Sequence, residues 1–438
     1  MILAKYFYFL FSSFLFLRGL RVLFWYFSVK MFLCQSKNKL AGTEIKEIII
    51  FIPLLHEETR LPVLIARFSK IINKFPIVKV VLITTERERT GGCRQAVDTI
   101  TLVKRIKKDG FFHIHYPFLN KTLAPQINFA VKQIESSVDF KAVQTFFGFY
   151  NADSNASPET IHSLLSEIPK NSEVSIFQQS SCFTENYKEL SSRLKLVALA
   201  NAIRQTAWTF FHEIPRYLKN KKSNFSLAHC VTHGLFIRAD TFLKLRGFPE
   251  DGFGEDLYFG FIARSFGYQI FPIVPLENSA SPERIGSLLR QQYTWFWGDL
   301  GYFYYWYRVI KRFKKADGIN YSILFFQTTL GIIDAFGWLL SGPFFIVFLL
   351  TAWYLDVFFL TIFAVYLYFG LVVICSLKIY EGLKPRSLFP KIKKIDKFFV
   401  FLFYPVTVLL RSAPAFLTIL KDIQLRISKG EYFRPKTE

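Results

Sequence analysis

Two long runs without a charged residue lie near the C-terminal end of the chain, and they restrict its fold more than any other feature. Residues 335–355 and 357–377 contain no Asp, Glu, Lys or Arg, and Asp356 separates them. Each run is long enough to cross the hydrocarbon core of a bilayer, about 30 Å thick, as a helix. The sequence therefore predicts an integral membrane protein with two adjacent spans inside a C-terminal membrane region, residues 321–420.

Two further apolar stretches lie outside these runs. Residues 398–420 are interrupted by two prolines and Arg411, so this stretch predicts a re-entrant or interfacial segment better than a simple span. Residues 1–33 are apolar but carry four basic side chains. Their uncharged core, residues 6–17, has the length of a signal peptide, yet no small-residue cleavage site follows it. We therefore expect residues 1–40 to be retained as a membrane anchor or an interfacial helix.

Basic residues indicate which side of the membrane the rest of the chain occupies. Residues 378–397 contain seven Lys or Arg against two acidic residues, and the tail, residues 421–438, is basic as well. Segments rich in Lys and Arg stay on the cytoplasmic side of a membrane. Because two spans return the chain to the side it came from, we expect an integral protein of the cytoplasmic (inner) membrane whose central domain faces the cytoplasm.

The formal net charge of +22 raises the alternative of a nucleic-acid-binding protein. Many of the positive residues gather at residues 308–315, directly after the aromatic block YTWFWGDLGYFYYWY. Basic residues beside an aromatic belt are typical of a membrane interface with anionic lipid, so we expect amphipathic interfacial helices over residues 288–320. No recognised base-reading module accompanies the charge. We therefore expect membrane lipids, and no nucleic acid, as partners.

The cysteines and histidines give little sign of a metal module. Five cysteines are scattered without paired spacing, which predicts reduced thiols rather than a disulfide framework. His229 and His233 have the i, i+4 spacing of a metal pair on a helix. The segment lacks the glutamate of the metalloprotease motif, so zinc is the less favoured interpretation of this pair.

The region from residue 47 to residue 150 alternates between strand-like and helix-like patterns. Apolar runs rich in β-branched and aromatic residues predict strands over residues 47–55, 77–85, 111–116 and 142–150. Helical patterns lie between them, over residues 61–74, 95–107 and 126–135. Such alternation predicts an α/β fold with a mostly parallel sheet covered by helices on both faces. Ligands bind beyond the carboxyl ends of the strands in such sheets.

The fourth expected strand runs directly into Asn151 and Asp153, which therefore stand at its carboxyl end. One interpretation is structural, because Asp153 could cap the helix that begins near Ser157. The other is functional, because an Asp here is a hard oxygen ligand for Mg²⁺ or Mn²⁺, and such an ion neutralises a diphosphate leaving group. The spacing alone leaves both interpretations open.

Several segments, taken in order, resemble the membrane-embedded family 2 glycosyltransferases, the group of the cellulose, chitin and hyaluronan synthases and ceramide glucosyltransferase. They are IFIPLLHEE, NKTLAPQINFAV, NADS, THGLFIRADTFLKLRGFPE, GEDLYFGFIARSFGY and RQQYTWFWG, and they lie within residues 47–300. No single segment is specific, but their joint order before the membrane spans is. The resemblance implies a GT-A fold, Rossmann-like with a mostly parallel sheet, for residues 41–287.

The resemblance also implies roles for individual residues. Asp153 would hold Mn²⁺ or Mg²⁺ on the donor diphosphate, and Asp256 would be the general base that deprotonates the acceptor hydroxyl. Glu255 would position the acceptor or the helix, although the helix dipole also favours acids in a first turn. The other implied donor-binding residues are Pro53, Glu57, Glu86, Lys121, Asn128 and Asn151, and the implied acceptor-binding residues are His233, Gln291 and Trp295.

Three positions depart from the family pattern. Asn151 replaces the first aspartate of the aspartate-x-aspartate motif, which lowers the metal affinity that we expect. Thr294 replaces the arginine of the Q-x-x-R-W motif and removes a guanidinium that could clamp the diphosphate; Arg290, one turn away, is a candidate substitute. The segment TTERE lacks the usual paired aspartates, with Glu86 the nearest carboxylate. The nucleotide base is therefore open, and only family frequency favours uridine.

A single carboxylate base with direct displacement implies inversion at the anomeric carbon. We therefore expect an inverting glycosyltransferase that moves a sugar from a nucleotide-diphosphate sugar, with UDP-sugar favoured, to a lipid or lipid-linked acceptor at the cytoplasmic membrane face. One alternative is a processive polysaccharide synthase, against which the small C-terminal membrane region counts. The other is an inactive glycosyltransferase-like scaffold, against which the retention of Asp153, Glu255 and Asp256 counts.

Overall fold

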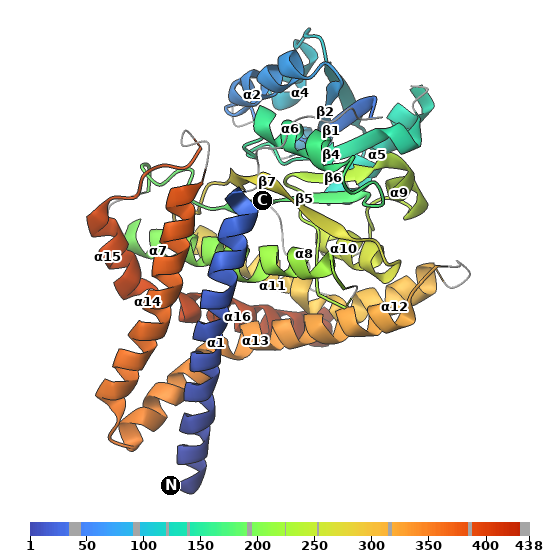
Figure 1. Cartoon of the computed structure of the whole chain (residues 1–438). Helices are drawn as coiled ribbons and strands as arrows, with labels where there is room; N and C mark the ends of the chain where they lie inside the picture. The colour runs from blue at the N-terminus through green and yellow to red at the C-terminus, as the bar shows by residue number, and fades with distance from the viewer. Residues whose placement is uncertain are drawn as a thin grey trace.

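A seven-stranded sheet forms the centre of the upper part of the molecule (Figure 1). The computed structural model describes residues 1–34, 45–90, 97–119, 122–137, 141–190, 195–223, 225–251, 254–313, 318–383 and 388–429. The strand order is β3-β2-β1-β4-β6-β5-β7. The strands are β1 (Glu47–Pro53), β2 (Val78–Thr85), β3 (Phe111–Tyr116), β4 (Thr145–Phe149), β5 (Ile176–Cys182), β6 (Leu235–Arg238) and β7 (Ile270–Asn278).

The sheet is parallel except at β6, which runs antiparallel to both β4 and β5. Strand β1 pairs in parallel with β2 on one side and with β4 on the other, where Phe51 lies opposite Phe149. The prediction of an α/β fold with a mostly parallel sheet is confirmed. The carboxyl ends of β1, β2 and β4 consequently meet at one edge, where ligands bind in sheets of this kind.

Helices cover both faces of the sheet because successive strand residues point in opposite directions. On β1, Ile48 and Ile50 pack with residues of α2 (Leu61–Lys74), α4 (Thr99–Lys104) and α6 (Pro158–Glu167). Ile49 and Phe51, on the other face, pack with residues of the remaining helices of this layer. Those helices are α5 (Leu123–Ser137), α9 (Ala239–Lys244), α10 (Glu255–Ser265) and α12 (Tyr302–Arg312).

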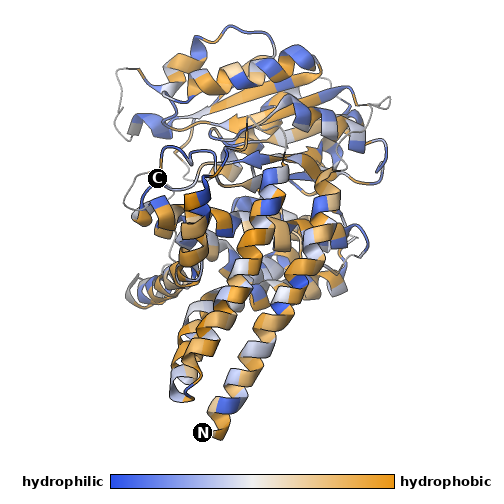
Figure 2. Cartoon of the chain, turned by 60° about the vertical axis from the view of Figure 1, so that its left-hand side comes forward, coloured by the Kyte–Doolittle hydropathy of each residue, from blue (hydrophilic) through white to orange (hydrophobic). Residues whose placement is uncertain are grey.

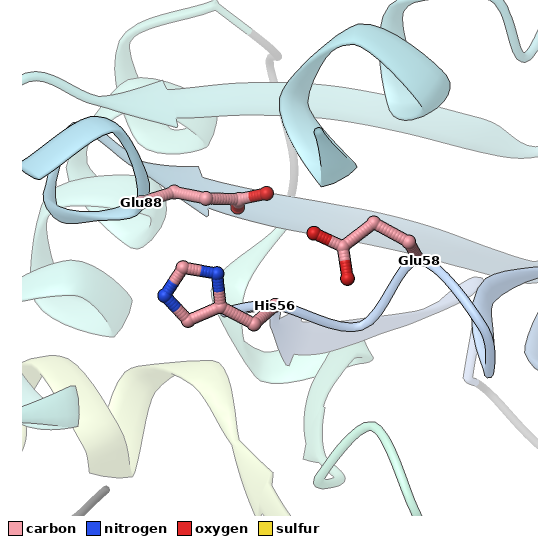
Figure 3. Close-up of side chains that lie close together, drawn as sticks. All are labelled: His56, Glu58 and Glu88. Carbon is pink, nitrogen blue, oxygen red and sulfur yellow. The ribbon is translucent and has the colours of Figure 1, made fainter. Parts of the chain in front are cut away.

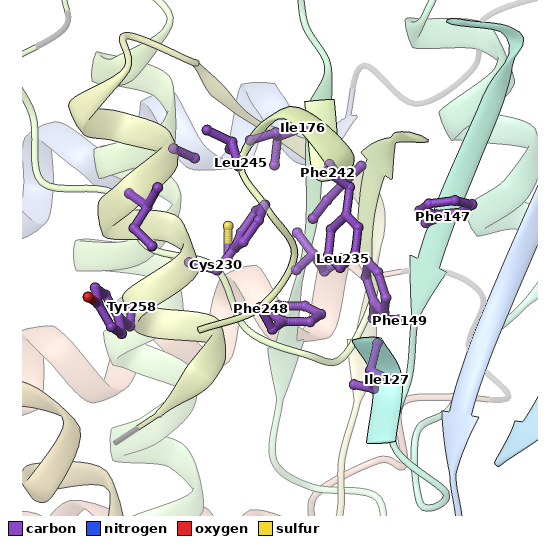
Figure 4. Packing of buried hydrophobic residues seen from close by; sticks show 14 of the residues in the cluster. Ile127, Phe147, Phe149, Ile176, Cys230, Leu235, Phe242, Leu245, Phe248 and Tyr258 are labelled. Carbon is purple, nitrogen blue, oxygen red and sulfur yellow. The ribbon is translucent and has the colours of Figure 1, made fainter. Parts of the chain in front are cut away.

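Aromatic rings fill the space between β4, α9 and α10 (Figure 4). Phe248 lies 4.9 Å from the ring of Phe149 and 5.2 Å from that of Phe259, measured between centroids. All three rings are buried. This packing fixes the start of α10, where Glu255 and Asp256 lie, relative to the end of β4.

A second set of helices extends away from the sheet (Figures 1 and 2). Among the described residues, three helices are long and apolar enough to cross a membrane: α1 (Ile2–Cys34), α13 (Tyr321–Tyr354) and α14 (Phe358–Gly382). Figure 2 shows that hydrophobic residues dominate their outer surfaces. Asp356, with φ of 56°, lies in the turn that joins α13 to α14. The two predicted C-terminal spans are therefore present as helices, and the N-terminal segment also forms a helix of spanning length.

The third apolar C-terminal stretch is bent. Helices α15 (Lys394–Phe403) and α16 (Val406–Lys429) meet at 53°, and the pair qualifies either as a broken span or as a re-entrant segment. Helix α16 packs against α13 and against α11 (Ile285–Leu300). The remaining elements are α3 (Arg87–Thr90), η1 (Ala142–Gln144), α7 (Lys195–Trp208), η2 (Thr209–Glu213) and α8 (Ile214–Asn220).

Candidate active site

The turn after β1 and the turn after β4 bring carboxylates together at one edge of the sheet. Asp153 is exposed in the second turn. Burial raises the pKa of Glu57, in the first turn, to about 7, with Arg60 opposing the shift and the negative charge of Asp153 adding to it. Pro53 ends β1 beside them and is half-buried. The two carboxylates are therefore close enough at the edge of the sheet for the charge of Asp153 to raise the pKa of Glu57.

Glu185, which follows β5, joins the same group of acids. Burial raises its pKa, and Glu277 and Asp153 raise it further while Arg67 opposes them. Its Oε1 accepts a hydrogen bond from Asn155 Nδ2 at 2.9 Å and lies 3.7 Å from Arg67 Nη2. Carboxylates that repel one another at an exposed edge fit a hard divalent cation, which would relieve that repulsion. We call Glu57, Asp153 and Glu185 the acidic edge.

The turn around Asn151 is held mainly by its own backbone. Asn151 N donates to Ser154 Oγ at 3.1 Å, and Ser154 N donates to Asn151 O at 3.1 Å. Arg67 Nη1 donates to Ser154 O. The N-cap of α6 is Ser157, so Asp153 does not cap this helix and its exposed carboxylate is available to a ligand. The structural interpretation of Asp153 is therefore wrong.

A positive charge stands beside the acids. Burial alone would lower the pKa of His233, but the hydrogen bond and charge of Glu277, together with Glu213 and Asp256, raise it to about 9. His233 Nδ1 lies 2.9 Å from Ser181 Oγ and 3.3 Å from Glu277 Oε2. His233 is therefore an imidazolium at neutral pH, close enough to Asp256 to be affected by its charge.

The start of α10 presents Glu255 and Asp256. The preceding residue, Gly254, has φ of 66°, a left-handed conformation that glycine adopts without the penalty of a Cβ. Asp256 Oδ2 accepts hydrogen bonds from Thr232 N at 2.9 Å and Thr232 Oγ1 at 3.2 Å. Its Oδ1 accepts from Leu257 N at 2.8 Å. These three donors orient the Asp256 carboxylate.

Glu255 has a different environment from its neighbour. Burial, followed by the negative charge of Asp256, raises the pKa of Glu255 to about 7. At neutral pH a substantial share of Glu255 is therefore protonated beside an oriented Asp256. The two adjacent carboxyl groups therefore have different surroundings, and Asp256 is the one that hydrogen bonds orient.

The acceptor residues expected from the sequence lie on α11. Gln291 Oε1 accepts a hydrogen bond from Gln205 Nε2 on α7 at 2.9 Å. Trp295 is 41% exposed, and its ring centroid lies 6.0 Å from that of Phe183, which follows β5. Thr294 Oγ1 donates to the Arg290 carbonyl at 3.0 Å. Trp295 and Phe183 together form an exposed aromatic surface.

Two of the expected donor-binding residues, Glu86 and Asn128, make other contacts. The carboxylate of Glu86 bonds Arg89 Nη1 and His115 Nε2, both at 2.9 Å. Asn128 bonds the backbone of Phe248 through both ends of its amide, at 2.8 and 2.9 Å. Lys121 lies outside the described residues. The structure thus brings Glu57, Asp153, His233 and Asp256 into one region, whereas the amide of Asn128 is occupied in joining α5 to the segment after α9.

The paired histidines do not form a helical metal site. Residues 229–233 lie outside the helices, so the i, i+4 spacing does not place His229 and His233 on one face of a helix. Burial lowers the pKa of His229 to about 4, and the imidazole of His233 contacts Ser181 and Glu277. The less favoured interpretation of this pair, as a metal pair on a helix, therefore has no structural basis.

Sequence reasoning missed Glu185 and Glu277 because it did not identify the strands that place them. Strand β5, IFQQSSC, is buried along its whole length although most of its residues are polar. Strand β7 contains two prolines, which argue against a central strand. A carboxylate near the end of each strand was the available signal: Glu277 is the second-last residue of β7, and Glu185 follows β5 by three residues.

Comparisons match the chain to one family model and to solved structures, among them the two described below. The model of the glycosyl transferase family group 2 matches residues 152–375. No curated protein matches the chain significantly. The mannosyltransferase PcManGT from Pyrobaculum calidifontis, in complex with GDP-Man and Mn²⁺, is 11% identical with a TM-score of 0.45, and the match covers 94% of this chain and 97% of that one. S. aureus TarS 1-349 is 11% identical with a TM-score of 0.40, covering 89% and 93% respectively.

Proposed function

The chain belongs to the glycosyl transferase family group 2, and from that premise we propose that it transfers a sugar, with inversion, from a nucleotide-diphosphate sugar to a lipid or lipid-linked acceptor at the cytoplasmic membrane face. The observation that carries this proposal is the proximity of the acidic edge, the His233 imidazolium and the oriented Asp256 in one region of the fold. Negative groups are thus available for the metal ion, and a positive group is available for the diphosphate.

On the donor side, Asp153, with Glu57 beside it, would hold Mn²⁺ or Mg²⁺. The ion supplies charge neutralisation for the diphosphate leaving group. His233 adds a fixed positive charge on the protein, which stabilises the negative charge that develops on the leaving phosphate. This charge would replace that of the family arginine, whose position Thr294 occupies in this chain. UDP remains the favoured nucleotide on the resemblance alone.

On the acceptor side, Asp256 is the general base. The acceptor hydroxyl oxygen attacks the anomeric carbon, the bond from that carbon to the diphosphate oxygen breaks, and the hydroxyl proton passes to the Asp256 carboxylate. The two hydrogen bonds from Thr232 hold that carboxylate in place. Glu255 positions the acceptor from the same turn of α10.

Two arginines near α11 support a lipid-linked acceptor. Arg411 of α16 lies between Trp208 and Trp338, 4.6 and 4.2 Å from their ring centroids. Arg204 donates to Gln292 Oε1 at 3.1 Å, next to Gln291. Cations stacked on aromatic rings beside membrane helices suit the phosphate of a lipid-linked acceptor. The exposed Trp295 would stack on a sugar or contact the lipid–water interface.

The test is turnover by purified full-length protein in lipid, with a panel of UDP- and GDP-sugars, Mn²⁺ or Mg²⁺, and a membrane extract as acceptor. The proposal predicts metal-dependent nucleotide release with one donor, a lipid-extractable product, and an inverted anomeric configuration by NMR. Asp153→Asn and Asp256→Asn should abolish it, and Asp109→Asn, an exposed aspartate before β3, is the matched control.

Three other outcomes of this test would contradict the proposal. A retained anomeric configuration excludes direct displacement, and a long polymer makes the protein a processive synthase. If no nucleotide is released with any donor, metal or acceptor, the inactive scaffold is favoured. The departures from the family motifs at Asn151 and Thr294 fit that interpretation too.

A further inference from the structure

We propose that His56, Glu58 and Glu88 form a second cation site, one that takes a transition-metal ion of the Zn²⁺ type. The site lies behind the acidic edge. His56 and Glu58 lie in the turn between β1 and α2, and Glu88 lies on α3, directly after β2 (Figure 3). One potential ligand atom from each of the three side chains lies within 4.8 Å of the other two.

The strongest observation is that three buried polar atoms in this cluster have no hydrogen-bond partner. They are His56 Nδ1, Glu58 Oε1 and Glu88 Oε2. The side chains point toward one another in Figure 3, and Glu58 and Glu88 are only 7% and 1% exposed. Burying a carboxylate without a partner is costly, and two of them together also repel each other. A bound cation would satisfy all three atoms at once.

The surroundings fix these side chains in place. Glu88 Oε1 accepts the backbone N–H of Thr99 at 2.5 Å, so only its second oxygen remains for a ligand. Thr99 Oγ1 in turn accepts the backbone N–H of Glu57 at 3.0 Å. His56 has φ of 56°, a left-handed conformation that is strained for a residue with a Cβ. Hydrogen bonds to a ligating carboxylate orient it for a metal, as this bond to Glu88 would.

The ligand set selects the metal. One imidazole nitrogen and two carboxylate oxygens suit Zn²⁺ and related transition-metal ions, whereas Mg²⁺ prefers oxygen ligands alone. Ligands bound at about 2.0–2.2 Å around a tetrahedral ion lie about 3.3–3.6 Å apart, so the three atoms, which lie within 4.8 Å of one another, need to close by about 1.5 Å at most. Three protein ligands leave a fourth position for water.

This site differs from the donor cation site in composition and burial. The donor site is built on Asp153, which is exposed, whereas here Glu58 and Glu88 are buried and the half-buried His56 adds an imidazole. A metal here would join the turn that carries Glu57 to the helix that follows β2. It would thereby fix the position of Glu57 on the donor side.

The experiment measures metal binding in the absence of any nucleotide sugar, so its result does not depend on the proposed transferase activity. Untagged full-length protein in lipid nanodiscs is stripped with a chelator, titrated with Co²⁺ while the visible absorption is followed, and dialysed against Zn²⁺ for elemental analysis. We expect one tightly bound ion per chain, with Zn²⁺ displacing Co²⁺. Thermal melting should show that Zn²⁺ stabilises the wild-type protein.

Two ligand variants and two controls decide the result. His56→Ala and Glu58→Gln should each weaken binding by more than about 100-fold, since loss of an outer-shell partner alone costs 10–100-fold. Asp153→Asn and Glu159→Gln, the latter an exposed acid on α6, should keep the ion. Glu58→Gln preserves side-chain size, and its melting temperature without metal reports whether it folds. No ion bound below about 10 μM, or one retained in folded Glu58→Gln, would overturn the proposal.

Discussion

The donor side and the acceptor side of the site are built in opposite ways. On the donor side, Glu57, Asp153 and Glu185 converge at the sheet edge, and burial and mutual repulsion raise the pKa values of Glu57 and Glu185. On the acceptor side, Asp256 receives hydrogen bonds, Gln291 pairs with Gln205, and cations lie on aromatic rings. The donor-side acids therefore still repel one another despite the arginines beside them, whereas the acceptor-side carboxylate is held by neutral hydrogen-bond donors.

This difference predicts a division of labour. A group of repelling carboxylates is stabilised by a cation that arrives with the donor, so metal and nucleotide sugar should bind together. An oriented, hydrogen-bonded carboxylate needs no such partner and can act on the acceptor as soon as it arrives. The following variants test whether the two sides are as separate as this comparison requires.

The largest effect should come from Asp256→Asn, which removes the base and keeps the side-chain size. We expect kcat to fall by about 10²–10⁴-fold with little change in the donor KM. Nucleotide release with saturating acceptor measures it. Asp240→Asn is the matched control, because Asp240 also lies in the first turn of a helix and bonds the next backbone N–H. A fall of less than tenfold would remove Asp256 from the role of base.

Asp153→Asn should reduce activity by about 10²–10³-fold, because the metal loses its charged protein ligand. This variant should also need a higher Mn²⁺ concentration than the wild type to reach half of its maximal activity. Asp109→Asn, exposed and distant in sequence, should leave the titration unchanged. If Asp153→Asn lowered the maximal rate without moving the metal titration, the donor cation would have to be held by other residues.

Trp295→Ala should raise the acceptor KM by about threefold to tenfold, the effect of losing an aromatic stacking contact. Donor binding should not change, because Trp295 lies on the acceptor side. Trp353→Ala, at the far end of α13 and 68% exposed, is the control for loss of a tryptophan in contact with lipid. An equal effect of both variants would assign the role of Trp295 to membrane contact.

The smallest effect concerns stability and His233. Its pKa is about 9 in the folded protein against about 6.5 unfolded, so its stabilisation is complete below pH 6.5 and is lost as pH rises through 9. Thermal melting at pH 6 to 9.5 should show a steeper decline for wild type than for His233→Gln. His162→Gln on α6 should follow the wild-type curve. Parallel curves for wild type and His233→Gln would mean that His233 is neutral.

Much of the sheet could be predicted from the sequence. The expected helix over residues 61–74 coincides with α2, and the first three expected strands differ from β1, β2 and β3 by two residues or fewer at either end. The runs of β1 and β2 are nearly all apolar because helices cover both faces of the sheet there. The membrane helices followed equally from long runs without charges.

The second half of the sheet and the pairing of acids could not be predicted. Strand β6 is antiparallel and only four residues long, and β5 is buried with its glutamines hydrogen-bonded. The buried side chain of Gln179 donates to Thr160 and Pro275 and accepts from Tyr150, and all three partners are distant in the chain. In the same way, the closeness of Glu58 and Glu88 depends on the parallel pairing of β1 with β2, and no local pattern reports it.

The most direct test of the division of labour is metal-dependent donor binding, measured by titration calorimetry on full-length protein in lipid. The donor is the nucleotide sugar identified by turnover. Asp256→Asn should bind it with wild-type affinity in Mn²⁺ while transferring no sugar, and Asp153→Asn should lose the Mn²⁺ dependence of binding. Loss of donor binding in Asp256→Asn, or unchanged Mn²⁺-dependent binding in Asp153→Asn, would contradict the account.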